Sequence, residues 1–143
     1  MRSSAIGPGP ATAAATLTAL AGLHVAWGMG SSFPATGRAD MADAVAGSDV
    51  VPGPAACFAV AAGLLGAAGV VTGAACSGAP VPRAGAAVVV TGFAARAVLG
   101  FTGATHLVAP GGTTSERFRR LDRRAYAPLC AGIALAALPA ALR

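Results

Sequence analysis

The chain alternates between four long apolar stretches and shorter segments that carry its charges and most of its prolines. The apolar stretches predict transmembrane helices at about residues 11–29, 55–76, 86–108 and 126–142. The second stretch has no charged residue and, at about 1.5 Å per residue, is long enough to cross a hydrocarbon layer about 30 Å thick. The pattern therefore predicts an all-α integral membrane bundle of four transmembrane helices, with residues 1–143 forming a single domain.

The first stretch lies where a secretory signal would have its apolar region. It is longer than the roughly 7–15 residues typical of such a region. It also ends in His24, Trp27 and a glycine turn rather than at a clear cleavage site. An uncleaved first helix is therefore expected.

A basic segment precedes the last apolar stretch. Residues 113–116 (TTSE) have the form of a capping box, which satisfies the free amides at the start of a helix. In the helix that follows, Phe118, Leu121 and Ala125 recur on one face, while arginines fill the others (Arg117, Arg119, Arg120, Arg123, Arg124). This pattern predicts a short amphipathic helix in the membrane interface, with its arginines on lipid headgroups. Pro128 then suits the first turn of a separate final span.

The composition supports a membrane location. The sequence is 55% hydrophobic and 10% charged, whereas soluble domains carry about 25% charged residues. The formal net charge of +5 comes with a basic cluster beside an apolar stretch, which favours anionic lipid headgroups over nucleic acid. Membrane lipids are therefore the expected partners, together with a protein partner or further copies of the chain.

The arginines also predict an orientation. Four crossings place both termini on one side, and residues 30–54 and 110–125 on the other. The second side holds six arginines and the first holds three. The positive-inside rule therefore favours cytoplasmic loops and external termini.

Arg96 lies near the middle of the third predicted span, where a charge costs at least about 2.5–3.5 kcal/mol. It shares a helical stripe with Gly92, Gly100 and Gly103, so we expect it to face the other helices. All five acidic residues lie outside the predicted spans, and no intramembrane carboxylate is expected to pair with it. Its predicted partners are backbone carbonyls, hydroxyls, water or the anionic group of a ligand. A purely structural role remains the alternative.

The other residues capable of binding are predicted to gather at one membrane face. They form, with Arg96, the candidate ligand- or anion-binding set: His24, Trp27, His106, Asp122 and Tyr126. Interfacial anchoring is the alternative, since aromatic residues form belts at membrane surfaces. The two histidines lack the spacing of metal or haem ligands, so neither a metal site nor a cofactor is expected.

Cys57, Cys76 and Cys130 each lie in an apolar stretch and have no paired spacing, so they indicate neither a disulfide framework nor a zinc site. A small membrane oxidoreductase that uses Cys57 and Cys130 with a quinone-like ligand is one alternative function. It requires their Cα atoms to lie within about 7 Å. A small transporter is another, but the predicted spans lack the acidic relay group that proton coupling uses.

Three segments carry a resemblance to a known family. They are HVAWGMGSSFP (24–34), PGPAACFAVA (52–61) and RFRRLDRRAYAPLC (117–130). Together they resemble domain-of-unknown-function family 3995, a family of uncharacterised bacterial four-helix membrane proteins. The resemblance extends from about His24 to Leu138.

The most specific part of the resemblance is one ordered set of residues: Phe118, Asp122, Tyr126, Pro128, Leu129 and Cys130. Arg96 and Ala97 match the third-span motif. The family pattern has an acid shortly after this arginine, where the present chain has Leu99 and Gly100. The resemblance implies four helices in a bacterial plasma membrane and no particular activity. Because the sequence offers packing and anion-binding residues but no catalytic set, it favours a non-enzymatic protein that binds a lipid or a partner through Arg96 and the loop arginines.

Overall fold

The computed structural model describes residues 5–108 and 114–142, and every regular element in these ranges is helical. The elements are α1 (Pro8–Gly28), α2 (Arg38–Ala46), α3 (Pro54–Ser77), α4 (Pro80–Thr102), the 3₁₀ helix η1 (Ala104–Leu107), α5 (Glu116–Leu121), the π-helix η2 (Asp122–Tyr126) and α6 (Ala127–Leu142). The predicted all-α class is confirmed.

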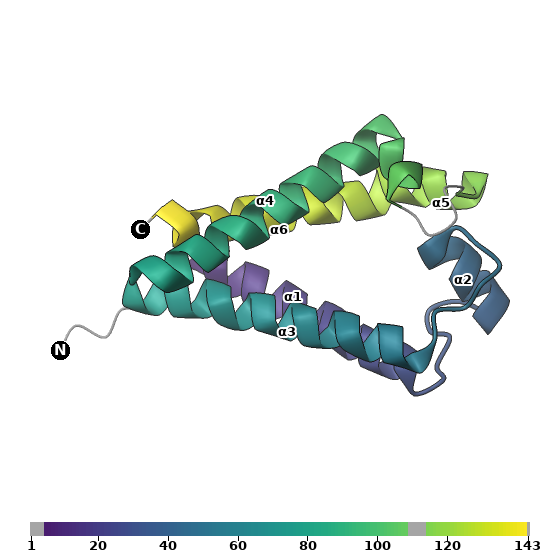
Figure 1. Ribbon diagram of the computed structural model, residues 1–143, viewed down its shortest axis with the longest axis horizontal. Helices are drawn as coiled ribbons and strands as arrows, with labels where there is room; N and C mark the ends of the chain where they lie inside the picture. The colour runs from purple at the N-terminus through teal and green to yellow at the C-terminus, as the bar shows by residue number, and fades with distance from the viewer. Residues whose placement is uncertain (1–4, 109–113, 143) are drawn as a thin grey trace.

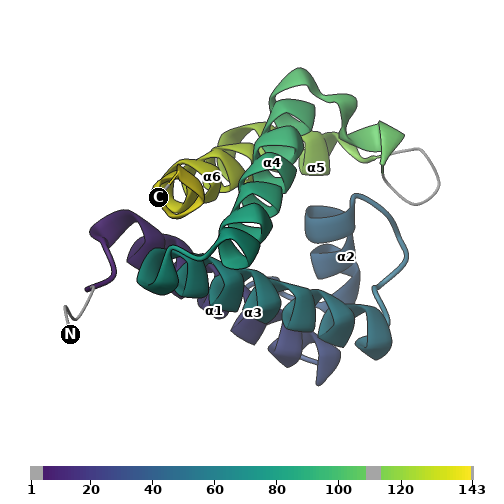
Figure 2. The same ribbon diagram turned by 60° about the vertical axis from the view of Figure 1, so that its left-hand side comes forward.

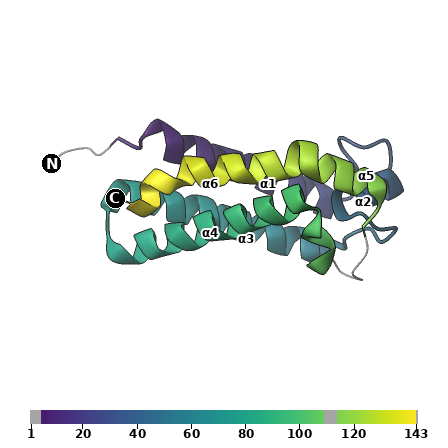
Figure 3. The same cartoon turned by 90° about the horizontal axis from the view of Figure 1, so that it is seen from above.

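The long helices form two pairs arranged as a wedge (Figure 1). Helix α1 packs along α3, and α4 packs along α6; the pairs touch where α1 meets α6 and α3 meets α4. The pairs are close together at the end that carries the chain termini and apart at the opposite end, beside α2 and α5. Seen from above, α4 and α6 run side by side (Figure 3).

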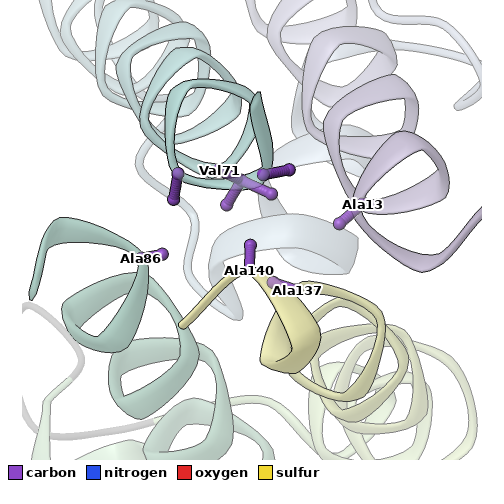
Figure 4. Packing of buried hydrophobic residues seen from close by; sticks show 7 residues of the cluster. Ala13, Val71, Ala86, Ala137 and Ala140 are labelled. Atoms are coloured by element: carbon purple, nitrogen blue, oxygen red, sulfur yellow. The ribbon is translucent and has the colours of Figure 1, made fainter. Parts of the chain in front are cut away.

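Side-chain size explains the narrow end of the wedge. Small residues dominate the narrow end, and Figure 4 shows them meeting from all four long helices: Ala13, Val71, Ala86, Ala137 and Ala140. Larger residues follow toward the wide end: Leu17 and Ile133, then Trp27, Met41 and Cys57. Small residues allow helix backbones to approach closely. The pairs therefore converge where alanines meet, while the cluster of Trp27, Met41 and Cys57 packs α2 against α1 and α3.

Three helical segments are long and apolar enough to cross a membrane: Pro54–Ser77, Pro80–Thr102 and Glu116–Leu142. This finding indicates a membrane protein. Helix α1 has 21 residues but is less apolar and is not among them. The structure therefore supports three of the four predicted crossings by length and composition.

The third predicted span is displaced toward the N-terminus. Helix α4 runs from Pro80 to Thr102, instead of over residues 86–108. Its two prolines occupy the first turn, where a missing N–H leaves no intrahelical bond unmade. It ends at Gly103, which has the left-handed conformation (φ 74°) that stops helices.

The prediction of a separate interfacial helix is wrong. Residues 116–142 form one continuous helix, in which α5 passes through the η2 turn into α6. Ser115 caps its start, because its hydroxyl accepts a hydrogen bond from the Phe118 N–H at 3.1 Å. The predicted capping residue Thr113 lies outside the described residues.

Pro128 lies inside this helix rather than at the start of a new one. Its ring nitrogen cannot donate to the carbonyl four residues earlier, and its ring crowds that carbonyl. The helix widens directly before it, where Ala127 N–H bonds the Asp122 carbonyl five residues back. Such π turns often occur at functional sites, and this one begins at Asp122.

Candidate functional site

A cavity of about 740 Å³ lies toward the wide end of the wedge. Its walls come from α1, α2, α4 and the helix that begins at Glu116. The walls are mainly apolar, formed among others by Leu20, Leu23, Trp27, Met41, Val45, Leu121 and Leu129. A few polar side chains interrupt them: His24, Thr36, Asp40, Arg96, Arg117 and Tyr126. Mainly apolar walls with a few convergent polar groups are typical of small-molecule sites.

Arg96 forms an ion pair that the sequence did not predict. Its Nη2 donates a hydrogen bond to Asp122 Oδ1 at 2.7 Å, and the Thr105 hydroxyl donates to Asp122 Oδ2 at 2.5 Å. The Asp122 side chain is 2% exposed and that of Arg96 is 30% exposed. The expectation that Arg96 has no carboxylate partner is therefore wrong. Asp122 lies beside Arg96 because it belongs to the continuous last helix, which packs along α4.

Arg96 contributes to both the pair and the cavity. One of its terminal nitrogens bonds Asp122, while the guanidinium also lines the cavity wall. The other terminal nitrogen, Nη1, is buried and donates no hydrogen bond to the described residues. An unpaired buried donor carries a desolvation cost of roughly 1–3 kcal/mol. The remaining part of the Arg96 side chain, which is 30% exposed, is accessible to a further acceptor.

Gly100 makes this close packing possible. A Cβ at this position would lie 2.7 Å from Ala127 Cβ, 3.0 Å from Asp122 Oδ1 and 3.1 Å from Arg96 Nη1. The predicted glycine stripe is thus partly correct: Gly100 faces the last helix, whereas a Cβ on Gly92 would meet nothing within 4 Å.

Helix α2 lies across the wide end, between α5 and α3 (Figure 2). Arg117 donates a hydrogen bond to the Asp40 carboxylate and lies 3.5 Å from Asp43 Oδ2. The Tyr126 hydroxyl donates to the Ala44 carbonyl at 2.9 Å. These contacts hold α2 as a cover over one end of the cavity.

The end of α2 is anchored to the same helix. The Ser115 N–H donates to the Gly47 carbonyl at 3.0 Å. Gly47 has a left-handed conformation (φ 65°), and a Cβ there would lie 2.9 Å from the Phe118 ring. A glycine is therefore required where α2 ends against Phe118.

Acidification is expected to loosen α2. The Arg117 guanidinium, which donates a hydrogen bond to Asp40, holds the pKa of that carboxyl below its usual value. A lowered folded-state pKa means that the pair stabilises docked α2 at neutral pH, and that this contribution is lost below about pH 4. Trp27, the only tryptophan, packs in one cluster with Met41 of α2. We expect its fluorescence to shift to longer wavelength only below about pH 4.

Two variants separate this effect from general acid unfolding. Asp40→Asn is expected to show the shifted emission already at neutral pH, because the pair is absent. Asp49→Asn is the control, because Asp49 is an exposed acid between α2 and α3 that forms no ion pair among the described residues. This variant should have the emission of the unmodified protein. An Asp40→Asn spectrum identical to that of Asp49→Asn at neutral pH would contradict the proposed role of the pair.

His24 and Trp27 lie together on the α1 wall. Their rings are 4.8 Å apart in an edge-to-face arrangement. His24 Nδ1 lies 2.8 Å from the Leu20 carbonyl, and Trp27 Nε1 donates to the Phe33 carbonyl at 2.6 Å. Trp27 is only 6% exposed and lines the cavity.

Most of the predicted binding residues meet in this cavity. Four of the six line it: His24, Trp27, Arg96 and Tyr126. Asp122 lies behind Arg96, and His106 is exposed in η1, away from the cavity lining. Sequence reasoning missed Asp40 as the partner of Arg117, and Thr105 as a partner of Asp122. The signal for Asp40 was its spacing from Asp43, which puts both acids on one face of a short helix.

A second cleft lies on the outside of the last helix. It has a volume of about 640 Å³ and is lined by Gly103, Glu116, Arg119, Arg120, Arg123 and Arg124. Four of the five arginines predicted to contact headgroups thus share one surface. Arg117, the fifth, instead pairs with the acids of α2.

The cysteines lie in different surroundings. All three are free thiols: Cys57 is buried with Trp27 and Met41, Cys76 is exposed and Cys130 is partly buried. The Cys57 thiol lies 3.8 Å from the Pro52 carbonyl. Within residues 5–108 and 114–142, no group of three or more His, Cys, Asp or Glu side chains could hold a metal ion.

Comparison with known proteins gave one match. The model of a family described as "Protein of unknown function (DUF3995)" matches residues 17–137. Searches of the curated proteins and of the solved structures gave no match. The matched range contains every residue that lines the cavity and the outer cleft.

Proposed function

The chain belongs to the DUF3995 family of proteins of unknown function, and from that premise we propose that it is a four-span membrane protein that binds a lipid beside Arg96. The observation that carries the proposal is the cavity itself. Its walls are apolar along α1 and the last helix, and the Arg96 side chain, which is 30% exposed, lies among them. An apolar chain with an oxygen-rich headgroup matches both features.

The proposal counts α1 as the fourth span. This helix contains no charged residue, and its 21 residues reach about 31 Å at 1.5 Å per residue. Its threonine hydroxyls donate to carbonyls four residues earlier, at 2.8 Å from Thr12, 2.9 Å from Thr16 and 2.8 Å from Thr18. Polar groups must be satisfied internally in hydrocarbon, so these bonds make α1 compatible with a bilayer.

The proposed location is a bacterial plasma membrane with residues 30–54 and 110–125 on the cytoplasmic side. The excess of arginines in these two segments supports this orientation. In the wedge, α2 and α5 both lie at the wide end, as this topology requires.

The charges on the cavity walls favour a lipid with little net charge inside the cavity. Arg96 is balanced by Asp122, and Arg117 is balanced by Asp40 and Asp43. The ligand would therefore accept hydrogen bonds from the guanidiniums rather than neutralise them. Carbonyl, ester or hydroxyl oxygens at the end of an acyl or isoprenoid chain have this chemistry.

Binding rather than catalysis is supported by how the wall groups are used. Trp27 donates to the Phe33 carbonyl and Tyr126 donates to the Ala44 carbonyl, so both polar groups stabilise the cavity walls and neither is free to act on a substrate. We therefore propose that the protein holds a lipid, which it stores or presents to a partner.

A cavity-filling substitution tests the proposal. Leu20→Trp adds bulk to the cavity wall, while Leu135→Trp adds the same bulk on the outer face of α6, where Leu135 is 70% exposed. Each variant is purified in mild detergent, and bound molecules are identified by native mass spectrometry. We expect a lipid to co-purify with the unmodified protein and with Leu135→Trp, and to be lost from Leu20→Trp.

Helix content by circular dichroism shows whether each variant is folded. Leu23→Phe, a smaller change on the same wall, provides the readout if Leu20→Trp does not fold. Equal amounts of the same lipid on all folded variants would overturn the cavity as the binding site.

A further inference from the structure

We propose that the outer cleft is a second binding site, for the headgroup of a lipid that carries two phosphate groups. The cleft lies between the end of α4 and the start of the last helix. Its arginine surface consists of Arg119, Arg120, Arg123 and Arg124. This site is separate from the cavity beside Arg96 and does not depend on the function proposed for that cavity.

The fold separates the charges of this segment onto opposite faces of one helix. Asp122 points inward to Arg96, and Arg117 is held by Asp40. Neither residue therefore adds its charge to the arginine surface. The neighbouring Arg123 and Arg124 are exposed on the other side.

The arginine surface has a large uncompensated charge. Its only ion pair among the described residues is a long one, with 3.7 Å between Arg119 Nη2 and Glu116 Oε1. The Glu116 side chain is 86% exposed. Four guanidiniums against one carboxylate leave a formal charge of +3 in the cleft lining.

Arg123 is positioned by the end of α4. Its Nη2 would lie 2.8 Å from a Cβ placed on Gly103, so the guanidinium rests on the backbone there. A helix C-terminus carries partial negative charge and favours a cation. This contact holds Arg123 beside Gly103, and both residues line the cleft together with the other three arginines.

The ligand class follows from charge and geometry. A guanidinium can bind one phosphate through two parallel hydrogen bonds. Four guanidiniums can therefore hold two phosphates between them. Against the formal charge of +3, a lipid with one phosphodiester leaves +2 uncompensated, and a lipid with two leaves +1. The volume of about 640 Å³ lies within the roughly 300–1,000 Å³ range of small-molecule sites.

The level of the cleft indicates a lipid source. It is formed where one candidate span, Pro80–Thr102, ends and another, Glu116–Leu142, begins. In a spanning protein this is the level of the headgroups, and basic pockets between transmembrane helices bind such headgroups.

The test compares two lipids at equal total phosphate. The protein is placed in nanodiscs that contain either cardiolipin, with two phosphates, or phosphatidylglycerol, with one, and retained lipid is measured by native mass spectrometry. We expect cardiolipin to be retained preferentially. Replacing all four arginines of the surface with lysine keeps the charge but removes the paired hydrogen bonds, and should abolish the preference for cardiolipin.

The controls separate the competing explanations. Arg38→Lys changes an exposed arginine outside the cleft and should leave the preference intact. Leu20→Trp should also leave the cardiolipin preference intact, because Leu20 lines the inner cavity and not the cleft. Loss of lipid from the inner cavity would therefore not contradict the proposed headgroup site. A four-lysine variant with unchanged preference would overturn the proposal in favour of charge alone. Displacement of cardiolipin by soluble pyrophosphate would overturn the lipid source and assign a soluble diphosphate instead.

Discussion

Replacing Asp122 with alanine should lower the free energy of unfolding by roughly 3 kcal/mol. Asp122 is 1% exposed and bonds both Arg96 and Thr105. Removing one partner of a buried ion pair typically costs about 3–5 kcal/mol, because the other charge stays buried without compensation. We take the lower end because the Arg96 side chain is 30% exposed and retains some contact with water. The measurement is an unfolding titration in mixed micelles, followed by circular dichroism.

A double substitution provides the control. Arg96→Met with Asp122→Leu removes both charges and fills the space with apolar side chains, a change that is often neutral or stabilising. We expect the double variant to recover most of the stability lost by Asp122→Ala. A single variant within about 0.5 kcal/mol of the unmodified protein, the range typical of surface substitutions, would show that the pair does not stabilise the fold.

Hydrophobic patterning predicted the helices well because each long helix must be apolar on most of its surface. The ranges 55–76 and α3 nearly coincide, since Pro54 and Gly78 mark both ends. The predicted third span began too late because the prolines and glycines of residues 77–85 (SGAPVPRAG) indicate a connection by local pattern. The two prolines of this segment, Pro80 and Pro82, instead occupy the first turn of α4, where proline is favoured.

The ion pair was missed because it depends on tertiary register. Arg96 and Asp122 are far apart in sequence, and counting charges per predicted span placed the aspartate outside the bundle. The sequence did contain a signal. Phe118, Asp122 and Tyr126 recur at intervals of four, so Asp122 lies on the same side of the helix as two aromatic residues. An acid on the apolar side of an amphipathic helix indicates a buried partner.

The same reasoning explains why the five arginines of this segment make different contacts. Adjacent arginines on a helix point in different directions, so a single role for all five was not to be expected. Arg117 meets the acids of α2, whose position no local pattern could give. The remaining four stay on the outer surface, where the headgroup prediction still applies.

Replacing Gly100 with alanine should destabilise the contact between α4 and α6. The added Cβ would lie 2.7 Å from Ala127 Cβ, which is fixed to the backbone and cannot rotate away. The helices would have to separate, and overpacking of this kind costs about 1–3 kcal/mol. The same substitution gains up to about 1 kcal/mol of helix propensity. Gly92→Ala in the same helix has that gain without a contact within 4 Å, and is the matched control.

We therefore expect Gly100→Ala to be less stable than Gly92→Ala by roughly 2 kcal/mol in the same micelle titration. Combining it with Asp122→Ala tests the cause, because residues that share contacts are not additive. Asp122 Oδ1 is one of the three atoms that the new Cβ would crowd, at 3.0 Å. The cost of Gly100→Ala should therefore fall when Asp122 is alanine. If Gly100→Ala lowered the free energy of unfolding equally with Asp122 and with alanine at that position, Gly100 would be needed only for the close approach of α4 and α6, and not for the ion pair.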